Sequence, residues 1–281
     1  MIGSVAEPEP EARAGSLLRR IVWHWCHDPK RELWFAWWMM VVFYNLYGLL
    51  FFVVARVQPP PDPGWDVPTV VQWFTDHHLG VLSGFAIIFL VTGFIVPTNA
   101  LLAYSMRRMS VSRAFAYSYL IIYSLAAVPG MLLTCIALTV GSIRPDRDPA
   151  LIHWLYDFAF MAFDGTMGVF LIGSLVWMAA VLLDENRVFP KWFGYLNLCN
   201  ALTEVVVAPA WIFKRGAFAW DGEIAWWINM VVFVIYTIVF ISLLRRMIER
   251  EDFGTGPLPN LPTDDADAEA RDPSGSMAMA R

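Results

Sequence analysis

Six long apolar segments recur along this 281-residue chain, and they constrain its fold more than any other feature. A helix needs about 20 apolar residues to cross the roughly 30 Å hydrocarbon core of a bilayer. Only helices and closed barrels satisfy their backbone hydrogen bonds in lipid. The sequence therefore predicts an all-α polytopic membrane protein with a six-helix transmembrane domain over residues 34–246. The predicted transmembrane helices are 34–55, 80–104, 115–143, 151–183, 192–213 and 224–244.

The composition and motifs exclude several classes of protein. With 58% hydrophobic and 16% charged residues, the chain is too apolar for an ordinary soluble domain, which has roughly 45 to 50% apolar and 25% charged residues. We expect the lipid bilayer to be its main partner, and no basic patch indicates nucleic acid. No Walker A, nucleophile elbow or HExxH motif occurs, and the histidine-containing stretches 24–27 and 76–78 lack the spacing of a metal site. We therefore expect neither a metal nor a cofactor.

The two ends of the chain differ in composition from its centre. Residues 1–15 are rich in Glu, Pro, Ala and Gly and are predicted to be disordered. Residues 16–33 alternate apolar and basic side chains with a helical period, which predicts an amphipathic juxtamembrane helix on the inner leaflet. Residues 254–281 are rich in Pro, Asp, Ala and Ser, which predicts a disordered acidic C-terminal tail.

The distribution of Lys and Arg predicts the orientation in the membrane. The N-terminal segment, the loops after the second and fourth helices and the C-terminal tail carry fifteen of these residues, and the other three loops carry five. The positive-inside rule therefore places both termini in the cytoplasm. Arg outnumbers Lys by seventeen to three, and no Asn-x-Ser/Thr sequence occurs. Both features favour a bacterial inner membrane.

The fourth apolar segment, 151–183, carries three ionisable residues on one helical face. At 100° per residue, the side chains of His153, Asp157 and Asp164 fall within about 40° of one another. A carboxylic acid in a membrane helix costs roughly 2.5 to 3.5 kcal/mol and usually faces the bundle interior. We interpret Asp164 and Asp157 as candidate catalytic or proton-handling groups, with His153 as a ligand contact or relay at the entrance. The alternative is that Asp157 lies in the headgroup region and only Asp164 is buried.

A second polar stripe lies in the fifth segment. Asn197, Asn200 and Glu204 recur at i, i+3 and i+7 and share an arc of about 60°. A short loop joins the fourth and fifth segments, so we expect adjacent antiparallel helices. Counted from their shared end, Asp164 and Glu204 differ in depth by roughly 10 Å, so both can line one cavity without touching. Glu204 is thus a second candidate acid and the asparagines are candidate ligand contacts, unless the asparagines only join helices.

Other polar side chains in the apolar segments are weaker candidates. Asn229 and Tyr236, in the last segment, are candidate ligand contacts, although their default interpretation is structural. The remaining intramembrane polar residues are interpreted as structural, among them Asn45, Thr98, Asn99, Tyr119 and Tyr123.

Buried acids in a membrane bundle support three hypotheses about function. The leading one is a polar cavity between the fourth and fifth helices that binds or transforms a hydrophobic small molecule, such as a sterol, terpenoid or lipid. In its enzymatic form, Asp164 or Glu204 donates a proton in an isomerisation or cyclisation. The alternatives are a proton-coupled transporter or binding protein, and a structural or accessory subunit bound to a protein partner or a second copy. The cavity hypothesis predicts two acids that face one closed cavity. A transporter predicts a site accessible from both sides of the membrane, and an accessory subunit predicts an acid that faces outward from the bundle.

Overall fold

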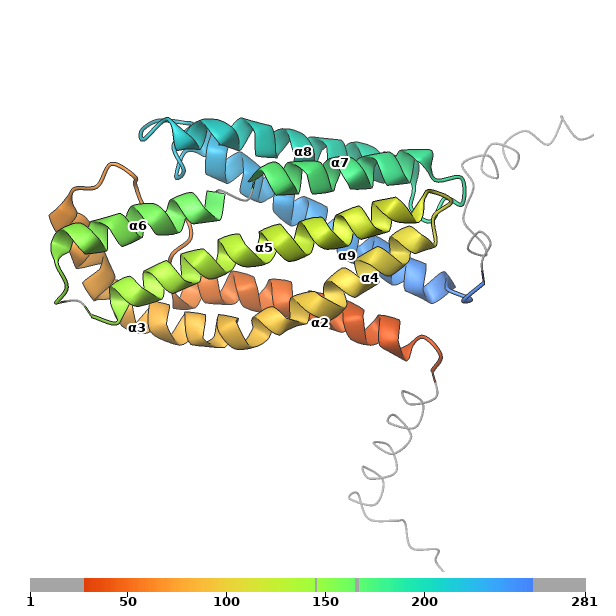
Figure 1. Ribbon diagram of the computed structural model, residues 1–281, viewed down its shortest axis with the longest axis horizontal. Coiled ribbons are helices and arrows are strands. Elements are labelled where there is room, and N and C mark those ends of the chain that lie inside the picture. The colour runs from red at the N-terminus through yellow and green to blue at the C-terminus, as the bar shows by residue number, and fades with distance from the viewer. Residues whose placement is uncertain (1–27, 145, 165–166, 255–281) are drawn as a thin grey trace, which may run out of the picture.

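A computed structural model describes residues 28–144, 146–164 and 167–254, and every regular element in these ranges is helical (Figure 1). The α-helices are α2 (Arg31–Gly48), α3 (Val67–Val91), α4 (Ile95–Arg107), α5 (Arg113–Ser142), α6 (Pro149–Asp164), α7 (Met167–Leu183), α8 (Lys191–Val207) and α9 (Asn229–Arg250). Short segments with 3-10 or π-helical geometry are η1 (Leu49–Val54), η2 (Thr92–Phe94), η3 (Ala208–Trp211) and η4 (Glu223–Ile228).

Four stretches of the described chain are long and apolar enough to cross a membrane, which confirms the prediction of an all-helical protein with membrane-spanning helices. They are Arg31–Val54, Val67–Arg107, Pro149–Leu183 and Glu223–Arg250. Large apolar side chains also cover the outside of these helices, as a surface in contact with lipid requires. Leu90 is 80% exposed and Val96 is 72% exposed. The N-terminal region and most of the predicted amphipathic helix, 1–27, and the predicted tail from residue 255 lie outside the described ranges.

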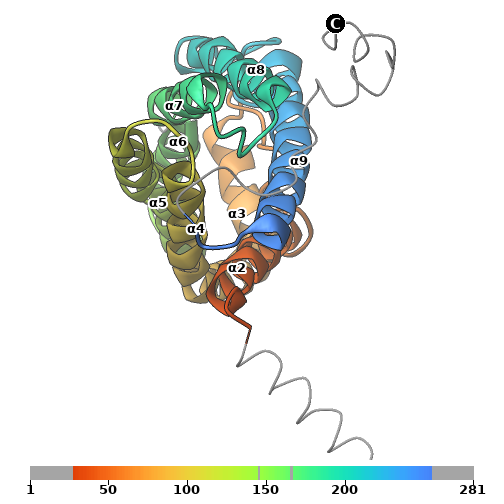
Figure 2. The same cartoon turned by 90° about the vertical axis from the view of Figure 1, so that its right-hand side faces the viewer.

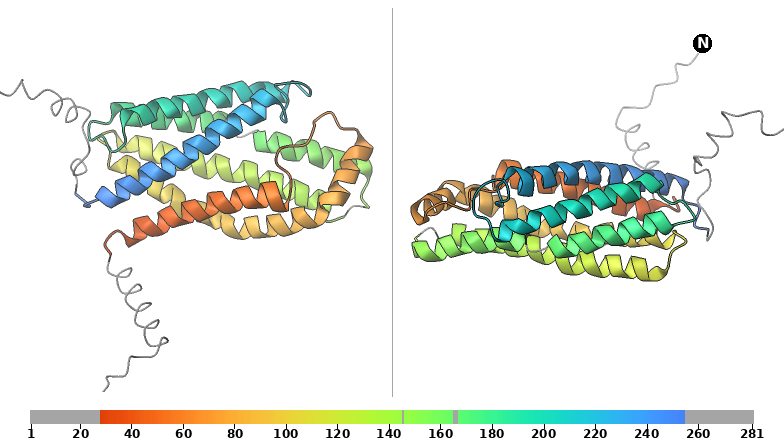
Figure 3. Two further views of the ribbon diagram at one scale, coloured as in Figure 1. Left: turned by 180° about the vertical axis from the view of Figure 1, so that it is seen from behind. Right: turned by 90° about the horizontal axis from the view of Figure 1, so that it is seen from above.

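Six helices form a closed ring in the half of the bundle where α2 begins and α9 ends. Around this ring α2 packs on α4, α4 on α5, α5 on α7, α7 on α8, α8 on α9 and α9 on α2, as the view along the bundle shows (Figure 2). Toward the other end, α3 and α6 pack on α5 and on each other. Seen from behind, α2 and α9 converge toward the end that holds the start of α2 and diverge away from it (Figure 3).

The second predicted span begins earlier than expected. It was expected from residue 80, but α3 begins at Val67. Asp66 caps the helix by accepting hydrogen bonds from the hydroxyl and the backbone N–H of Thr69, and Pro68 occupies the first turn. These hydrogen bonds hold the pKa of Asp66 below its usual value. The cap therefore places the first turns of α3 before the apolar run.

The fifth and sixth predicted spans also end at other residues. The fifth was expected to reach residue 213, but α8 ends at Val207, two residues before Pro209, because proline cannot donate the next helical hydrogen bond. The sixth was expected to end at residue 244, but α9 continues to Arg250. Met247 and Ile248 are fully buried, so the packed face of α9 extends beyond its most apolar stretch.

Two hydrophobic cores fill the bundle, one toward each end. The first, where α3 and α6 begin, includes the fully buried side chains of Phe85 and Tyr156. The second, where α2 begins and α9 ends, includes those of Tyr119 and Trp177. The bundle is therefore packed at both ends, which leaves its middle as the place where a cavity can form.

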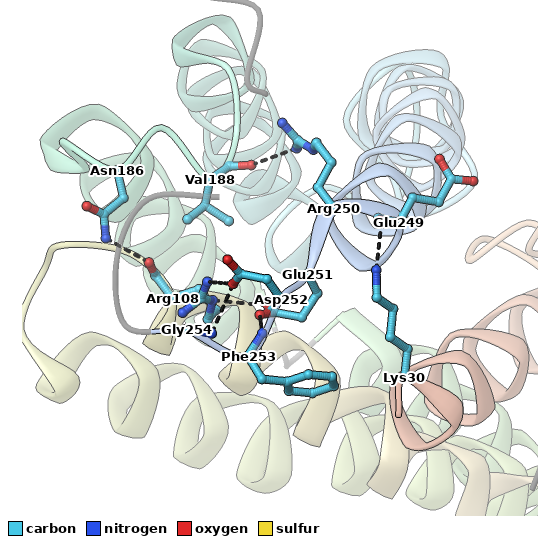
Figure 4. Close-up of polar contacts among 10 residues, drawn as sticks. All are labelled: Lys30, Arg108, Asn186, Val188, Glu249, Arg250, Glu251, Asp252, Phe253 and Gly254. Carbon is cyan, nitrogen blue, oxygen red and sulfur yellow. Dashed lines mark hydrogen bonds and ion pairs between the residues drawn. The ribbon is translucent and has the colours of Figure 1, made fainter. Parts of the chain in front are cut away.

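A buried ion-pair cluster joins helix ends where α9 terminates (Figure 4). The Nε atom of Arg108 lies 3.0 Å from Oε2 of Glu251, and its terminal nitrogen lies 3.1 Å from Oδ1 of Asp252. The side-chain amide of Asn186 donates a hydrogen bond to the carbonyl oxygen of Arg108 at 2.9 Å. Residues after α9 thus reach the end of α4, and the loop between α7 and α8 binds the same residue of α4, so that Arg108 links all three.

Asp184 organises the loop between α7 and α8 from a buried position. Its side chain is 1% exposed and accepts hydrogen bonds from the backbone N–H groups of Ser110, Asn186 and Val188 at 2.8, 3.0 and 2.8 Å. The ammonium of Lys191 donates to three carbonyl oxygens at the end of α7 and the start of the loop, the last being that of Asp184. The short connection therefore holds α7 and α8 in the adjacent antiparallel arrangement seen in Figure 1.

Candidate functional site

A cavity of about 200 Å³ lies inside the ring of helices, between the two hydrophobic cores. All six helices of the ring contribute to its wall, together with α6 and η4. Eleven of its twenty-five lining residues are aromatic, namely Phe43, Tyr44, Tyr47, Tyr119, Tyr123, Phe163, Phe170, Trp226, Phe233, Tyr236 and Phe240. The wall is therefore mainly apolar, and its few polar side chains mark where a ligand would be oriented.

The two acids singled out from the sequence both line this cavity. Asp164 is the last residue of α6, and Glu204 lies in the last turn of α8. Neither carboxyl group makes a hydrogen bond or ion pair with another residue in the described parts of the chain, and the Oδ2 atom of Asp164 is fully buried. Because both residues line the cavity and polar groups inside a protein are normally paired, these two unpaired carboxyl groups are available to a ligand.

The amide side chains of α8 have two different roles. Asn200 lines the cavity, and its amide donates a hydrogen bond to the hydroxyl of Ser174 in α7 at 2.9 Å. Asn197 is fully buried outside the cavity wall, where its amide donates to the carbonyl of Phe193 at 2.8 Å and its oxygen accepts from the hydroxyl of Tyr236 at 3.0 Å. Asn197 therefore positions Tyr236, which lines the cavity, and does not itself reach it.

His153 and Asp157 do not reach the cavity. His153 lies in the second turn of α6 and Asp157 near the middle of that helix, and Asp157 Oδ2 is 3.9 Å from His153 Nδ1 and 3.8 Å from the ammonium of Lys214. The Nε2 atom of His153 is 3.3 Å from the carbonyl oxygen of Trp65. Both side chains are about 30% exposed. Of the polar stripe predicted on the fourth segment, only Asp164 lines the cavity, although Oδ1 of Asp157 is also buried and has no hydrogen-bond partner in the described residues.

Asp221 lies in the loop before η4 and gives a prediction about pH. Burial raises the pKa of Asp221, and the nearby carboxylates of Asp62 and Glu223 raise it further. The pKa of an Asp carboxyl in the unfolded chain is about 3.9. When the folded-state pKa lies above that value, the ionised carboxyl destabilises the fold, so the protein gains stability as the pH falls through the folded-state pKa. Asp221→Asn should therefore be more stable than the parent at pH 7, and this advantage should shrink on acidification.

Thermal unfolding of both proteins in the same detergent between pH 4 and 7 checks this expectation. Asp76→Asn is a suitable control, because Asp76 is an exposed carboxyl on the first half of α3. A lower melting temperature for Asp221→Asn at pH 7, or parallel pH profiles for the variant and the parent, would contradict the assignment.

Several lining residues were interpreted from the sequence as structural or were not singled out. Asn99 and Tyr123 line the cavity from α4 and α5, and Tyr119 does so beside Tyr123, one helical turn away. Tyr44 and Tyr47 line it from α2. A polar or aromatic residue at i and i+3 or i+4 in an apolar segment was the available signal for both tyrosine pairs. Such pairs are common in hydrophobic cores, however, so they indicate a site only when the arrangement of the neighbouring helices is known.

Trp226 connects the cavity wall to the loop after η1. Its indole N–H donates a 2.6 Å hydrogen bond to the side-chain oxygen of Gln58, and both residues are 6% exposed. The indole of Trp220 donates similarly to the carbonyl of Pro61 at 2.7 Å. These two hydrogen bonds hold the loop that follows η1 against η4 and the segment before it.

Within the described residues, no group of three or more His, Cys, Asp or Glu side chains is arranged to hold a metal ion. Comparisons with protein-family models, with curated proteins and with solved structures return no match for this chain. The case for function therefore depends on the cavity itself.

Proposed function

We propose that this chain is an integral membrane protein whose central cavity binds, and in an enzymatic role transforms, a hydrophobic small molecule. The observation that carries the proposal is that Asp164 and Glu204 line one interior cavity whose wall is otherwise mainly aromatic and aliphatic. Acids are expensive in membrane helices and usually mark sites of function. A role as an accessory subunit would favour an acid on the outer surface of the bundle, whereas these two acids line its interior.

The cavity volume restricts the ligand. Pockets for drug-sized molecules enclose roughly 300 to 1,000 Å³, whereas an apolar cavity of about 150 Å³ in another protein already holds benzene. At about 200 Å³, this cavity suits a small terpenoid or one end of a longer lipid better than a whole sterol.

In its enzymatic form, the proposal gives the two carboxyl groups different roles. One of Asp164 and Glu204 would donate a proton to an alkene or oxygen of the ligand, and the other, with Asn200, would orient the resulting cation. The aromatic wall would stabilise positive charge by cation–π contact. This chemistry uses only side chains that line the cavity.

We also propose six membrane crossings, with both termini in the cytoplasm of a bacterium and the bundle in its inner membrane. In support, α5 and α8 run beside the four long spans, and α2 begins at the end of the bundle where α9 terminates (Figure 1). Ten described Lys and Arg residues lie at or near the end where α2 begins, and five lie at the opposite end of the bundle. By the positive-inside rule, this distribution favours a cytoplasmic location for the end where α2 begins.

Native mass spectrometry of the gently extracted protein tests the proposed ligand site. A small hydrophobic molecule should co-purify with the parent and be lost or strongly reduced in Asp164→Asn and in Glu204→Gln, because each substitution removes a carboxylate from the cavity. Asp157→Asn is the matched control, since Asp157 lies on the same helix but outside the cavity, and it should retain the molecule. A stoichiometric protein partner with no bound small molecule would contradict the proposal and move the acids to an assembly interface.

A further inference from the structure

The cavity wall is acidic and has no compensating base. Its ionisable side chains, apart from tyrosines, are those of Asp164 and Glu204, and no Lys, Arg or His is among the lining residues. At the end of the bundle, by contrast, Asp157 has Lys214 and His153 beside it. A buried charge normally has a partner of opposite sign. Because the cavity wall provides no such partner for the two acids, a cationic ligand would supply it.

Hydrogen-bond acceptors without partners face the same space. Asn99 lines the cavity, is 5% exposed, and makes no hydrogen bond with the described residues. The side chain of Asn229 lines the cavity and is likewise unpaired within the described chain. Together with the carboxyl groups of Asp164 and Glu204, which also line the cavity, they provide carboxylate and amide oxygens on four helices, α4, α6, α8 and α9. An ammonium group has three N–H donors and no acceptor, which matches a set of acceptors on several helices that line one cavity.

The rest of the wall is suited to the same charge. The faces of aromatic rings attract cations, and aromatic cages are a common way to recognise ammonium ligands. Tyr44 of α2 contacts Phe233 of α9 with ring centroids 6.1 Å apart, and Tyr123 of α5 contacts Phe170 of α7 at 5.6 Å. All four rings line the cavity, so aromatic groups from four helices belong to the same wall as the two carboxyl groups.

We propose that the ligand of this cavity is a small lipophilic amine, bound as its ammonium ion between Asp164 and Glu204. The ammonium donates hydrogen bonds to the carboxylates and to the oxygen of Asn99, and the apolar body of the amine packs on the aromatic wall. The volume of about 200 Å³ limits that body to about one ring or a short branched chain, because an apolar cavity of about 150 Å³ already accepts benzene. This inference rests on the proposed function, since it specifies the ligand class of the same site.

Phenethylamine, which is cationic at neutral pH, and 2-phenylethanol, its neutral analogue of similar shape, form a matched pair of probes. Binding of each is measured by equilibrium dialysis against the protein in nanodiscs, with empty nanodiscs as the reference for partition into lipid. The parent should bind phenethylamine at least tenfold more tightly than the alcohol. In the double variant Asp164→Asn, Glu204→Gln, the preference for phenethylamine over 2-phenylethanol should fall to within about threefold. The affinity of this variant for the alcohol should stay close to that of the parent, and this unchanged affinity would show that the cavity is still folded. Asp157→Asn should keep the full preference.

Three results would overturn the amine assignment. Equal or tighter binding of 2-phenylethanol by the parent would mean that the cavity selects neutral ligands, and the proposed function would then stand without the charge. An unchanged preference in the double variant would place the amine at another site. Absence of binding by either probe would reject the assignment, and the co-purification experiment would decide separately whether the cavity binds any small molecule.

Discussion

Replacing Arg108 by alanine is expected to lower the free energy of unfolding by about 3 to 5 kcal/mol, the range typical for removing one partner of a buried ion pair. The guanidinium is 8% exposed, and the side chain of Glu251, 3.0 Å away, is fully buried. Alanine would leave that carboxylate buried without its cation and would also release Asp252. Equilibrium unfolding in mixed micelles, followed by circular dichroism, measures the loss.

Arg107 provides a matched control for this experiment. It precedes Arg108 directly and is exposed, so Arg107→Ala removes the same charge without uncovering a buried group and should change stability by less than about 0.5 kcal/mol. The paired substitution Arg108→Met, Glu251→Leu should recover most of the loss, because replacing a whole buried ion pair by apolar residues is often neutral. Equal losses for Arg107→Ala and Arg108→Ala would show that the cluster does not hold the helix ends together.

The two cavity acids could be found from the sequence because each is conspicuous by itself. An ionisable residue in a long apolar segment is rare and costly, so Asp164 and Glu204 stand out without any knowledge of their neighbours. The structure separates Asp164 from His153 for a geometric reason. Helical periodicity gives the angle around a helix axis but not the depth, and eleven residues separate the two along about 16 Å of helix. They share a face, yet one is at the end of the bundle and the other lines its interior.

The remaining wall of the cavity could not be predicted from single segments. Asn99 and Tyr123 become site residues only because α4 and α5 are neighbours in the closed ring. The closed ring depends on contacts between segments far apart in the chain, such as the hydrogen bond that the indole of Trp37 in α2 donates to the carbonyl oxygen of Ile241 in α9. Periodicity within one segment carries no information about such contacts. The number and type of the helices are therefore easier to predict than their arrangement.

One packing signal in the sequence does indicate a close contact between helices. Gly80 and Gly84 are four residues apart and lie on one face of α3, a spacing that allows close approach of membrane helices. In the structure this face meets η1: an added Cβ at Gly84 would lie 3.4 Å from side-chain atoms of Val54 and Ala55. The pattern belongs to the second apolar segment, and it predicts a close contact with another helix but not which one.

Gly80→Ala should therefore destabilise the protein by about 1 to 3 kcal/mol, the usual cost of overpacking. The new Cβ would lie 2.3 Å from the carbonyl oxygen of Val54, and because this atom belongs to the backbone, no change of rotamer can relieve the clash. Gly48→Ala is the control on the neighbouring helix: no heavy atom lies within 4 Å of its added Cβ, and alanine favours a helix over glycine by up to about 1 kcal/mol. The same unfolding assay should thus give changes of opposite sign at the two glycines. An unchanged or higher stability for Gly80→Ala would mean that α3 and η1 separate easily, and that their close approach does not hold α2 in place beside the cavity.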